Sequence, residues 1–210
     1  IKSEDFVICE IGGTVGDIEG LPFFEAIRQI GNEKGKDDVI FIHVTLIPYI
    51  RAAKELKTKP TQHSVKELRS IGITPRILIC RSEMEVPQSE RDKIALFCNL
   101  EPENVVQCLD MSSIYEVPLA LHKQELDKRI LEYFNISTEK DTNLNKWRKL
   151  KTQIANIKES VTIAMVGKYT GLQESYKSLT EALEHAGIAS NVSINIKWVD
   201  SRKSNIVIDS

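Results

Sequence analysis

Glu10-Ile-Gly-Gly-Thr-Val-Gly-Asp-Ile-Glu19 is the stretch of the sequence that decides the fold. It follows an apolar run, residues 6–9, that predicts a strand, and precedes a segment, residues 21–31, whose pattern predicts a helix. A carboxylate after a strand, followed by a glycine-rich turn, is typical of the ligand-binding edge of an open α/β sheet. Acidic side chains this close together repel one another unless a cation or sugar hydroxyls lie among them. We interpret residues 10–19, the acidic turn, as part of a nucleotide–metal site.

Apolar runs alternate with helical patterns along the chain. The predicted strands cover residues 6–9, 39–47, 77–80, 105–109, 163–166 and 192–199. The predicted helices cover residues 21–34, 64–70, 89–98 and 175–185. Pro87 near the start of the third helix and Gly187 just past the end of the fourth are expected as helix boundaries. The alternation predicts an α/β fold in which crossover helices join parallel strands.

The chain divides into two parts joined by a helical stretch. Residues 119–134 are expected to form the closing helix of a first domain, residues 1–142, and residues 143–158 a helix within a linker, residues 143–160. A new sheet is expected from Val161, in a domain covering residues 161–210. About fifty residues are too few to complete an α/β domain. The chain starts at Ile1 and stops in a predicted strand, so we expect an excerpt of a longer protein.

Composition excludes several classes of protein. The chain is 41% hydrophobic and 28% charged, with a net charge of −2, which leaves no basic patch for nucleic acid and no attraction to a membrane surface. No apolar run approaches the ~18 residues that span a bilayer. Its four cysteines lie far apart without CxxC spacing, so we expect reduced thiols in a cytoplasmic protein rather than zinc or disulfides.

A second informative segment, the lysine segment, is Lys57-Thr-Lys-Pro-Thr-Gln62. Two lysines with hydroxyls and an amide between them suit a triphosphate, and Pro60 stiffens the expected loop, which lowers the entropy lost on binding. The helix that follows offers free backbone N–H groups near its start. A solvated surface turn has the same composition, so on chemistry alone both interpretations stay open.

Together the two segments resemble the amidoligase domain of the CTP synthase family. Ile79-Cys-Arg-Ser82, Lys93-Ile-Ala-Leu-Phe-Cys98 and Ser113-Ile-Tyr115 fit that family in the same order. Val161-Thr-Ile-Ala-Met-Val-Gly-Lys-Tyr169 and Ser175-Tyr-Lys-Ser178 resemble the start of its glutamine amidotransferase domain. The resemblance covers essentially the whole chain. It implies an incomplete parallel-sheet amidoligase domain of the P-loop, dethiobiotin-synthetase-like class, a helical linker, and the first βαβ of a class I glutamine amidotransferase domain.

The resemblance also implies a reaction. The family makes CTP from UTP, with ATP as co-substrate and glutamine or ammonia as the nitrogen source. ATP phosphorylates the uracil 4-oxygen, ammonia displaces the phosphate, and Mg²⁺ neutralises the phosphates. CTP acts as feedback inhibitor, GTP is expected as an effector of the full enzyme, and the family assembles as homodimers and homotetramers.

Site residues follow from the same resemblance. Glu10 matches a Mg²⁺ ligand, although a strand-end acid that caps the next helix is the structural alternative. Phe97 lies one helical turn after Lys93 and is expected either to stack near the pyrimidine or to pack in the core. Residues matching UTP and CTP contacts are Asp17, Ile18, Glu19, Lys57, Thr58, Lys59, Pro60, Thr61, Gln62, Lys93 and Phe97. Residues matching ATP contacts are Arg81, Leu109, Asp110 and Met111.

Two parts of the family pattern do not occur in this sequence. It contains no GxxxxGK[ST] phosphate loop, and none of its cysteines has the glycine-flanked setting of the glutaminase nucleophile. We therefore assign no catalytic residue and expect no turnover by this chain alone. The alternative from another class is a non-catalytic nucleotide-binding or oligomerisation module derived from such an enzyme. A dethiobiotin synthetase is disfavoured because that family lacks both the lysine segment and the attached amidotransferase.

Overall fold

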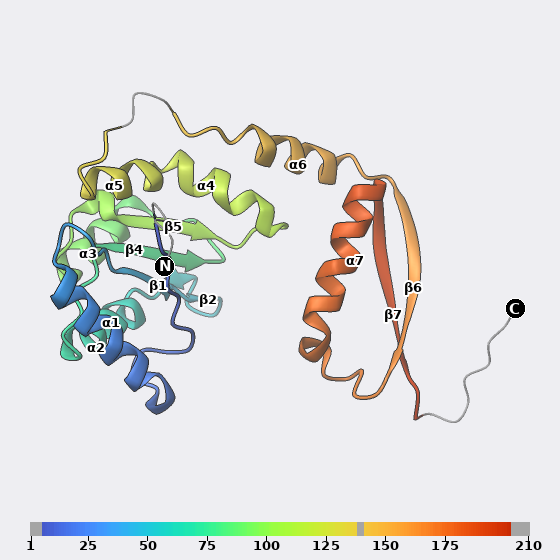
Figure 1. Ribbon diagram of the computed structural model, residues 1–210, viewed down its shortest axis with the longest axis horizontal. Helices are drawn as coiled ribbons and strands as arrows, with labels where there is room; N and C mark the ends of the chain where they lie inside the picture. The colour runs from blue at the N-terminus through green and yellow to red at the C-terminus, as the bar shows by residue number, and fades with distance from the viewer. Residues whose placement is uncertain (1–5, 138–140, 203–210) are drawn as a thin grey trace, which may run out of the picture. The chain divides into compact units, whose positions relative to one another are not determined.

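A computed structural model describes residues 6–137 and 141–202 of the chain (Figure 1). These residues belong to two compact units, Ile1–Asn143 and Leu144–Ser210. Both units are mixed α/β structures whose main strands run parallel, so the predicted fold class is confirmed. The strand expected over residues 206–210 lies outside the described residues.

A parallel sheet forms the centre of the first unit. The strands of this unit are β1 (Ile42–Leu46), β2 (Tyr49–Ile50), β3 (Glu55–Leu56), β4 (Ile77–Ser82) and β5 (Val105–Leu109). The sheet has the order β1-β4-β5, with Ile42 opposite Ile77 and Leu78 opposite Val105, while β2 and β3 form a separate antiparallel hairpin. Because the three strands are parallel, their carboxyl ends lie at the same edge.

Helices cover both faces of this sheet (Figure 1). The helices of the first unit are η1 (Ile18–Gly20), α1 (Leu21–Lys34), α2 (Lys59–Ser70), α3 (Gln88–Cys98), η2 (Pro102–Asn104), η3 (Ile114–Glu116), α4 (Val117–Lys123) and α5 (Leu126–Tyr133). On one face, Val65 of α2 and Ile94 of α3 pack with Leu78 of β4 in the largest buried cluster. On the other face, Leu126 of α5 packs against Ile77 of β4. Apolar side chains from each strand thus alternate between two cores.

The outer face of β1 is open. Ile42, Val44 and Leu46 point to the same side of the strand, since side chains alternate along it, and all three are exposed, Val44 by 62%. β1 is also the edge of the sheet, because β4 is the strand that pairs with it among the described residues. An aliphatic flank therefore faces outward from the described part of this unit.

Local signals mark the boundaries of α1 and α3 to within one residue of the prediction. Pro22 lies in the first turn of α1, and Gly35, with a φ of +85°, follows its last residue. Pro87 immediately precedes α3, which ends at Asn99 in the left-handed region. Both helices end because the next residue, Gly35 or Asn99, adopts a positive φ that does not continue an α-helix.

The strand predicted over residues 6–9 is wrong. This segment is exposed and has no strand assignment, and Phe6 instead lies against the ring of Phe134, with centroids 5.7 Å apart. A strand needs a neighbour for its N–H and C=O groups, and an apolar run does not supply one. In the described part of the chain no ladder includes this segment.

The single closing helix predicted over residues 119–134 is also wrong, because it is divided into α4 and α5. The side-chain amide of Gln124 accepts a hydrogen bond from the Gln107 N–H at 2.9 Å and donates one to its carbonyl oxygen at 2.7 Å. These bonds satisfy the backbone of β5, and they draw Gln124 toward the sheet. Glu125 takes a φ of +61°, which redirects the chain before α5 begins.

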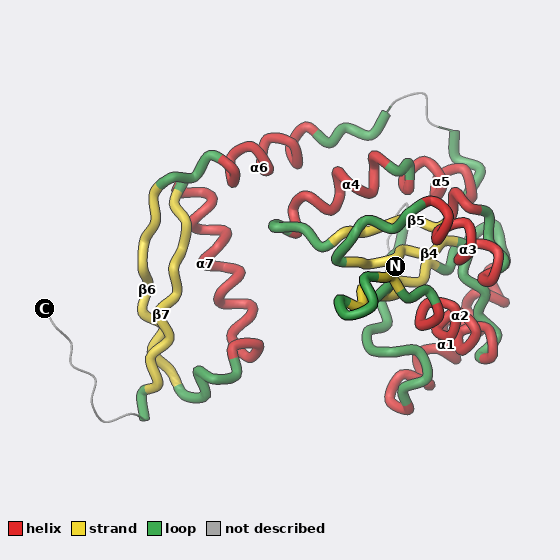
Figure 2. The backbone as a smooth tube through the Cα atoms, turned by 180° about the vertical axis from the view of Figure 1, so that it is seen from behind, coloured by secondary structure: helices red, strands yellow, loops and turns green. Residues whose placement is uncertain are grey.

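The second unit is a βαβ arrangement preceded by a helix. Its elements are α6 (Asn145–Ala155), β6 (Glu159–Gly167), η4 (Gln173–Tyr176), α7 (Lys177–Ser190) and β7 (Val192–Asp200). β6 and β7 pair in parallel along their whole length, and α7 lies beside them (Figure 2). Gln153 of α6 donates a hydrogen bond to the carbonyl oxygen of Ile188 at 2.7 Å, which ties α6 to the end of α7.

Gly187 does not end the helix as the sequence pattern predicts. It is a buried residue inside α7, and the helix continues to Ser190, after which Asn191 takes the left-handed conformation. A Cβ at position 187 would lie 2.7 Å from the carbonyl oxygen of Val192 and 2.7 Å from Cγ1 of Ile194. Glycine is required here by the close approach of α7 to β7, not by helix termination.

We expect Gly187→Ala to destabilise the second unit by about 1–3 kcal/mol through overpacking, although alanine favours helices. Backbone at Val192 cannot move aside as a flexible side chain could. Thermal unfolding measures the effect. Gly171→Ala is the matched control, because nothing lies within 4 Å of a Cβ at Gly171. A Gly187→Ala variant as stable as the control would contradict this packing.

None of the helices in residues 6–137 and 141–202 combines the length and apolarity needed to cross a bilayer.

Candidate nucleotide-binding site

Charged residues gather where β4 and β5 end. Arg81 is the fifth residue of β4, and Asp110 directly follows β5. Arg81 Nε donates to Asp110 Oδ1 at 2.7 Å, and this hydrogen bond raises the pKa of the Arg81 guanidinium. Asp110 N–H also donates to the carbonyl oxygen of Ser82 at 3.0 Å, which fixes the backbone after the strand. The structure therefore brings together two residues that the resemblance assigns to ATP contacts.

The lysine segment lies at the carboxyl end of β1. The β2–β3 hairpin returns the chain there, and the N–H of Lys57 donates to the carbonyl oxygen of Pro48 at 2.9 Å. The predicted loop is shorter than expected, because α2 begins at Lys59 and not at Ser64. Pro60 is thus a residue of the first helical turn, a position that its fixed φ favours. The first-turn N–H groups have no cap from the Thr58 side chain.

The residues of the lysine segment divide by exposure. The side chains of Lys57, Lys59 and Pro60 are exposed. Thr58 and Thr61 are buried, Thr61 with 0% exposure, so neither side chain is available to a ligand as it stands. These two side chains pack inward because they continue the buried stripe of α2, and contact of the segment with nucleotide stays a prediction.

Glutamates pair with the exposed lysines. Lys57 Nζ forms an ion pair with Glu55 on β3, and Lys93 Nζ lies 3.5 Å from Glu90 on α3. Exposed pairs of this kind contribute little to stability and exchange readily. Sequence reasoning missed Glu55, although an acid two residues before Lys57 lies on the same side of an extended chain and was a usable signal.

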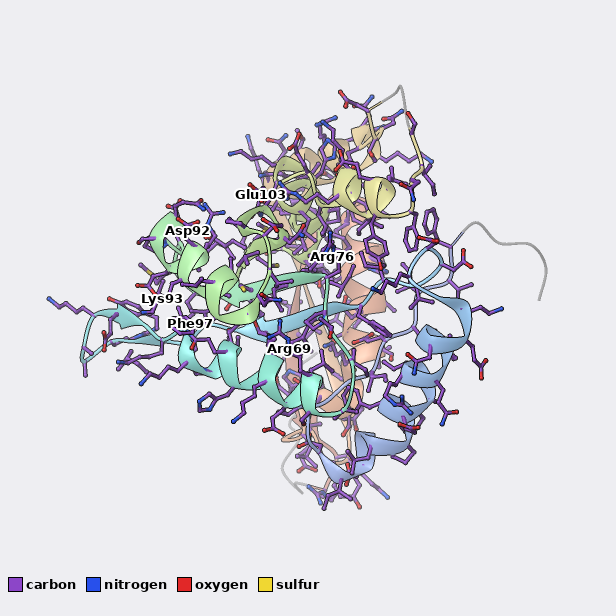
Figure 3. The ribbon with its side chains drawn as sticks, turned by 90° about the vertical axis from the view of Figure 1, so that its left-hand side faces the viewer. Arg69, Arg76, Asp92, Lys93, Phe97 and Glu103 are labelled. Atoms are coloured by element: carbon purple, nitrogen blue, oxygen red, sulfur yellow. The ribbon has the colours of Figure 1, made fainter. Side chains whose placement is uncertain are left out.

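Lys93 and Phe97 lie next to each other on the surface of α3 (Figure 3). Phe97 is 61% exposed, and so its expected packing in a core is wrong for the described part of the chain. Its neighbour Leu96 is also exposed, by 76%. An amphipathic helix that presents Phe97 beside a cation offers an aromatic face and a charge to a ligand or to another chain.

The acidic turn is an exposed loop held by its own hydrogen bonds. Asp17 Oδ2 accepts from the N–H of Thr14 at 2.9 Å, and η1 follows directly, so Glu19 is a residue of this short helix. Gly13 takes a φ of +84°, which a side chain would disfavour in so tight a turn. The carboxylates of Glu10 and Glu19 remain exposed.

The structure does not join the acidic turn to the lysine segment. The apolar residues of the turn, Ile11 and Val15, pack with Leu68 and Ile73, at the far end of α2 from Lys59. Among residues 6–137 and 141–202, no hydrogen bond or ion pair links the turn to residues 57–62. Neither do the described residues contain a cluster of three His, Cys, Asp or Glu that could hold a metal. Glu10 is thus a single exposed carboxylate, which suits Mg²⁺ only where phosphates supply further oxygens.

The remaining predicted residues lie beside the carboxyl edge of the sheet. Leu109 is the last residue of β5, and Met111 follows Asp110; both are half-buried. Ile18 is 84% exposed in η1, so it does not belong to the core of the described unit.

Comparison with known proteins gives consistent matches. The model of the family described as CTP synthase N-terminus matches residues 1–136. A CTP synthase of Parvibaculum lavamentivorans is 58% identical over 197 residues, which are 94% of this chain and 36% of that protein. A CTP synthase of Azospirillum brasilense is 56% identical over 198 residues, 94% of this chain and 36% of that protein. One from Pelagibacter ubique is 55% identical over 205 residues, 98% of this chain and 38% of that protein. The chain spans little more than a third of the length of these relatives.

Proposed function

Because this chain belongs to the CTP synthase family, we propose that it forms the nucleotide-binding part of a ligase that converts UTP to CTP with ATP and with glutamine or ammonia. The observation that carries this proposal is the arrangement at the start of α2. Exposed Lys57 lies just before this helix and exposed Lys59 is its first residue, and the Thr58 side chain does not cap the first-turn N–H groups at the carboxyl end of β1. A triphosphate needs this combination of mobile cations and oriented donors.

In this proposal the lysine segment binds the phosphates of UTP, and CTP occupies the same place as feedback inhibitor. Lys57 exchanges its exposed partner Glu55 for phosphate oxygens. Asp17, Ile18 and Glu19 contact the pyrimidine nucleotide from another part of the surface. Since the acidic turn and the lysine segment are not joined within the described residues, a second copy of the chain supplies one of them. Lys93 and the exposed Phe97 contribute to the same site.

ATP is assigned to the carboxyl ends of β4 and β5. The Arg81–Asp110 pair fixes a planar guanidinium there, on which an adenine ring can stack. Leu109 and Met111 provide half-buried apolar neighbours and backbone groups beside it.

Glu10 is the residue of this chain that would help to hold a Mg²⁺ ion bound with the nucleotide. When bound, this ion neutralises phosphate charge during phosphoryl transfer. The acidic turn holds its own shape through the Asp17–Thr14 bond, so Glu10 and Glu19 are displayed without rearrangement of the turn.

We assign the described units to two parts of the full enzyme. Residues 1–142 are proposed as amidoligase domain, residues 143–160 as linker, and residues 161–210 as the start of the glutamine amidotransferase domain. The proposal includes homodimers or homotetramers, GTP as effector of the full enzyme and a cytoplasmic location.

Calorimetric titration of UTP and CTP with Mg²⁺ tests the binding site. We expect both nucleotides to bind the chain, and we expect Glu19→Ala to weaken the binding of both. Glu33→Ala, which removes an exposed acid from α1, is the matched control. A parallel titration with inorganic triphosphate distinguishes binding of the phosphates from recognition of the pyrimidine base. Equal affinity of wild type, Glu19→Ala and Lys57→Ala for UTP would remove the site assignment.

The purified chain of 210 residues is expected to form no CTP from UTP, ATP and ammonia. The glycine-rich phosphate loop, which the phosphorylation of UTP by ATP needs with either nitrogen source, is not among its residues. Chromatographic separation of CTP from UTP measures the reaction. CTP formation by a preparation free of endogenous synthase would contradict the expectation.

A further inference from the structure

Three buried polar side chains connect the central strand to the first turn of α2. Thr61 Oγ1 lies 3.1 Å from Thr45 Oγ1 and 3.3 Å from the carbonyl oxygen of Leu46, and these two acceptors share its one hydroxyl hydrogen. Thr45 Oγ1 lies 3.7 Å from Cys80 Sγ, to which it donates. This Thr61–Thr45–Cys80 network therefore joins α2 to β1 and β1 to β4 through side chains. All three residues are buried.

A hydroxyl at position 61 is not needed for packing. α2 buries Thr61, Val65 and Leu68, which are spaced as one face of a helix, and the other two are aliphatic. Valine has nearly the shape of threonine and carries no polar atom whose burial must be offset. Burial also raises the pKa of Cys80 to about 11, so its thiol stays protonated near neutral pH and Thr45 keeps a neutral acceptor.

Hydrogen bonds differ from apolar contacts because they have direction. The Thr61 contacts fix both the rotation of α2 about its axis and its position along β1, whereas aliphatic side chains alone permit small shifts. Lys59 and Pro60 directly precede Thr61 and are exposed, and Lys57 lies just before the helix. The orientation of these groups and of the first-turn N–H groups therefore depends on where Thr61 is held.

We propose that Thr61, together with Thr45, is a positioning residue for nucleotide binding. The network holds the first turn of α2 at the carboxyl end of β1, so that Lys57, Lys59 and the free N–H groups converge on one triphosphate. This inference rests on the proposed function and assigns to Thr61 a role through its neighbours, not through contact with the ligand.

The test uses the full chain and four variants: Thr61→Val, Thr61→Ser, the double variant Thr45→Val/Thr61→Val, and Thr180→Val as control. Thr180 is a half-buried helical threonine outside the first unit, and its hydroxyl donates to a carbonyl oxygen of its own helix at 2.8 Å. UTP affinity, resistance to urea and hydrogen exchange of the backbone amides of residues 59 and 61–63 are measured for each; Pro60 has no N–H.

We expect Thr61→Val to weaken UTP binding about tenfold and to speed amide exchange in the first turn of α2, with Thr61→Ser close to wild type. The double variant is expected to regain resistance to urea, because it also removes the buried Thr45 oxygen that Thr61→Val leaves without its donor. Its UTP affinity should nevertheless stay as weak as that of Thr61→Val. Recovery of stability without recovery of affinity distinguishes positioning from a purely structural role.

Two results would overturn the inference. One is a Thr61→Val variant that loses stability but binds UTP as wild type does. The other is first-turn amide exchange that is the same in Thr61→Val and wild type, a measurement that needs no nucleotide. A wild-type chain that binds no UTP would refute the proposed function, and the exchange data would still decide whether Thr61 holds the first turn.

Discussion

Replacing Lys57 by alanine is expected to weaken UTP and CTP binding by about 10- to 100-fold, because a hydrogen bond to a charged group is stronger than a neutral one. The ammonium of Lys57 lies at the end of the β2–β3 hairpin, and Glu55 is its exposed partner. Loss of the ammonium removes a mobile cation from the proposed phosphate site without emptying a core. Calorimetric titration at several salt concentrations measures both the affinity and its electrostatic part.

Lys66→Ala is the matched control for this experiment. Lys66 is an exposed lysine on the same helix but outside the lysine segment. Both substitutions lower the net charge equally, so a general electrostatic effect would weaken binding equally in both. A Lys57→Ala variant that binds UTP as tightly as Lys66→Ala would contradict the assignment of residues 57–62 to phosphate.

Replacing Leu78 by alanine is expected to destabilise the first unit by about 2–5 kcal/mol, the cost of a cavity in a packed core. Leu78 is 0% exposed in the central strand β4 and belongs to the cluster that α2 and α3 cover. The same cluster supports the start of α2, so the site is expected to loosen with the core. Urea unfolding followed by circular dichroism gives the free energy of unfolding.

Leu96→Ala is the matched control, because it removes the same atoms from an exposed position instead of a buried one. Leu96 lies on α3 and is 76% exposed, so its loss leaves no cavity. We expect a change within about 0.5 kcal/mol, as for most surface substitutions. Similar losses for Leu78→Ala and Leu96→Ala would show that the described core does not stabilise the chain.

The fold could be predicted from the sequence wherever local signals decide it. α1 and β5 begin and end at the predicted residues, because a proline and a glycine delimit α1 and polar residues flank the apolar run of β5. The errors lie where a distant residue decides. Gln124 turns toward β5, and residues 6–9 have no pairing strand among the described residues. The partners of Gly187, Val192 and Ile194, are near it in the sequence, but the sequence pattern does not show that β7 packs closely against α7.

The site was predictable in part for the same reason. Strand order places Arg81 and Asp110 at one edge of a parallel sheet, and the structure pairs them. The burial of Thr58 and Thr61 could not be read from the lysine segment, since threonine occurs equally on surfaces and in first helical turns. Exposure of Phe97 likewise depends on which face of α3 meets the sheet.

The open flank of β1 has a practical consequence for anyone who prepares this protein. Val44 and Leu46 expose apolar side chains on β1, which is an edge strand among the described residues. Such an edge can pair with a strand of another molecule. We therefore expect this strand, together with exposed apolar side chains such as Leu96, to promote association of the chain at high concentration. A low protein concentration and a mild non-ionic detergent should reduce association through β1.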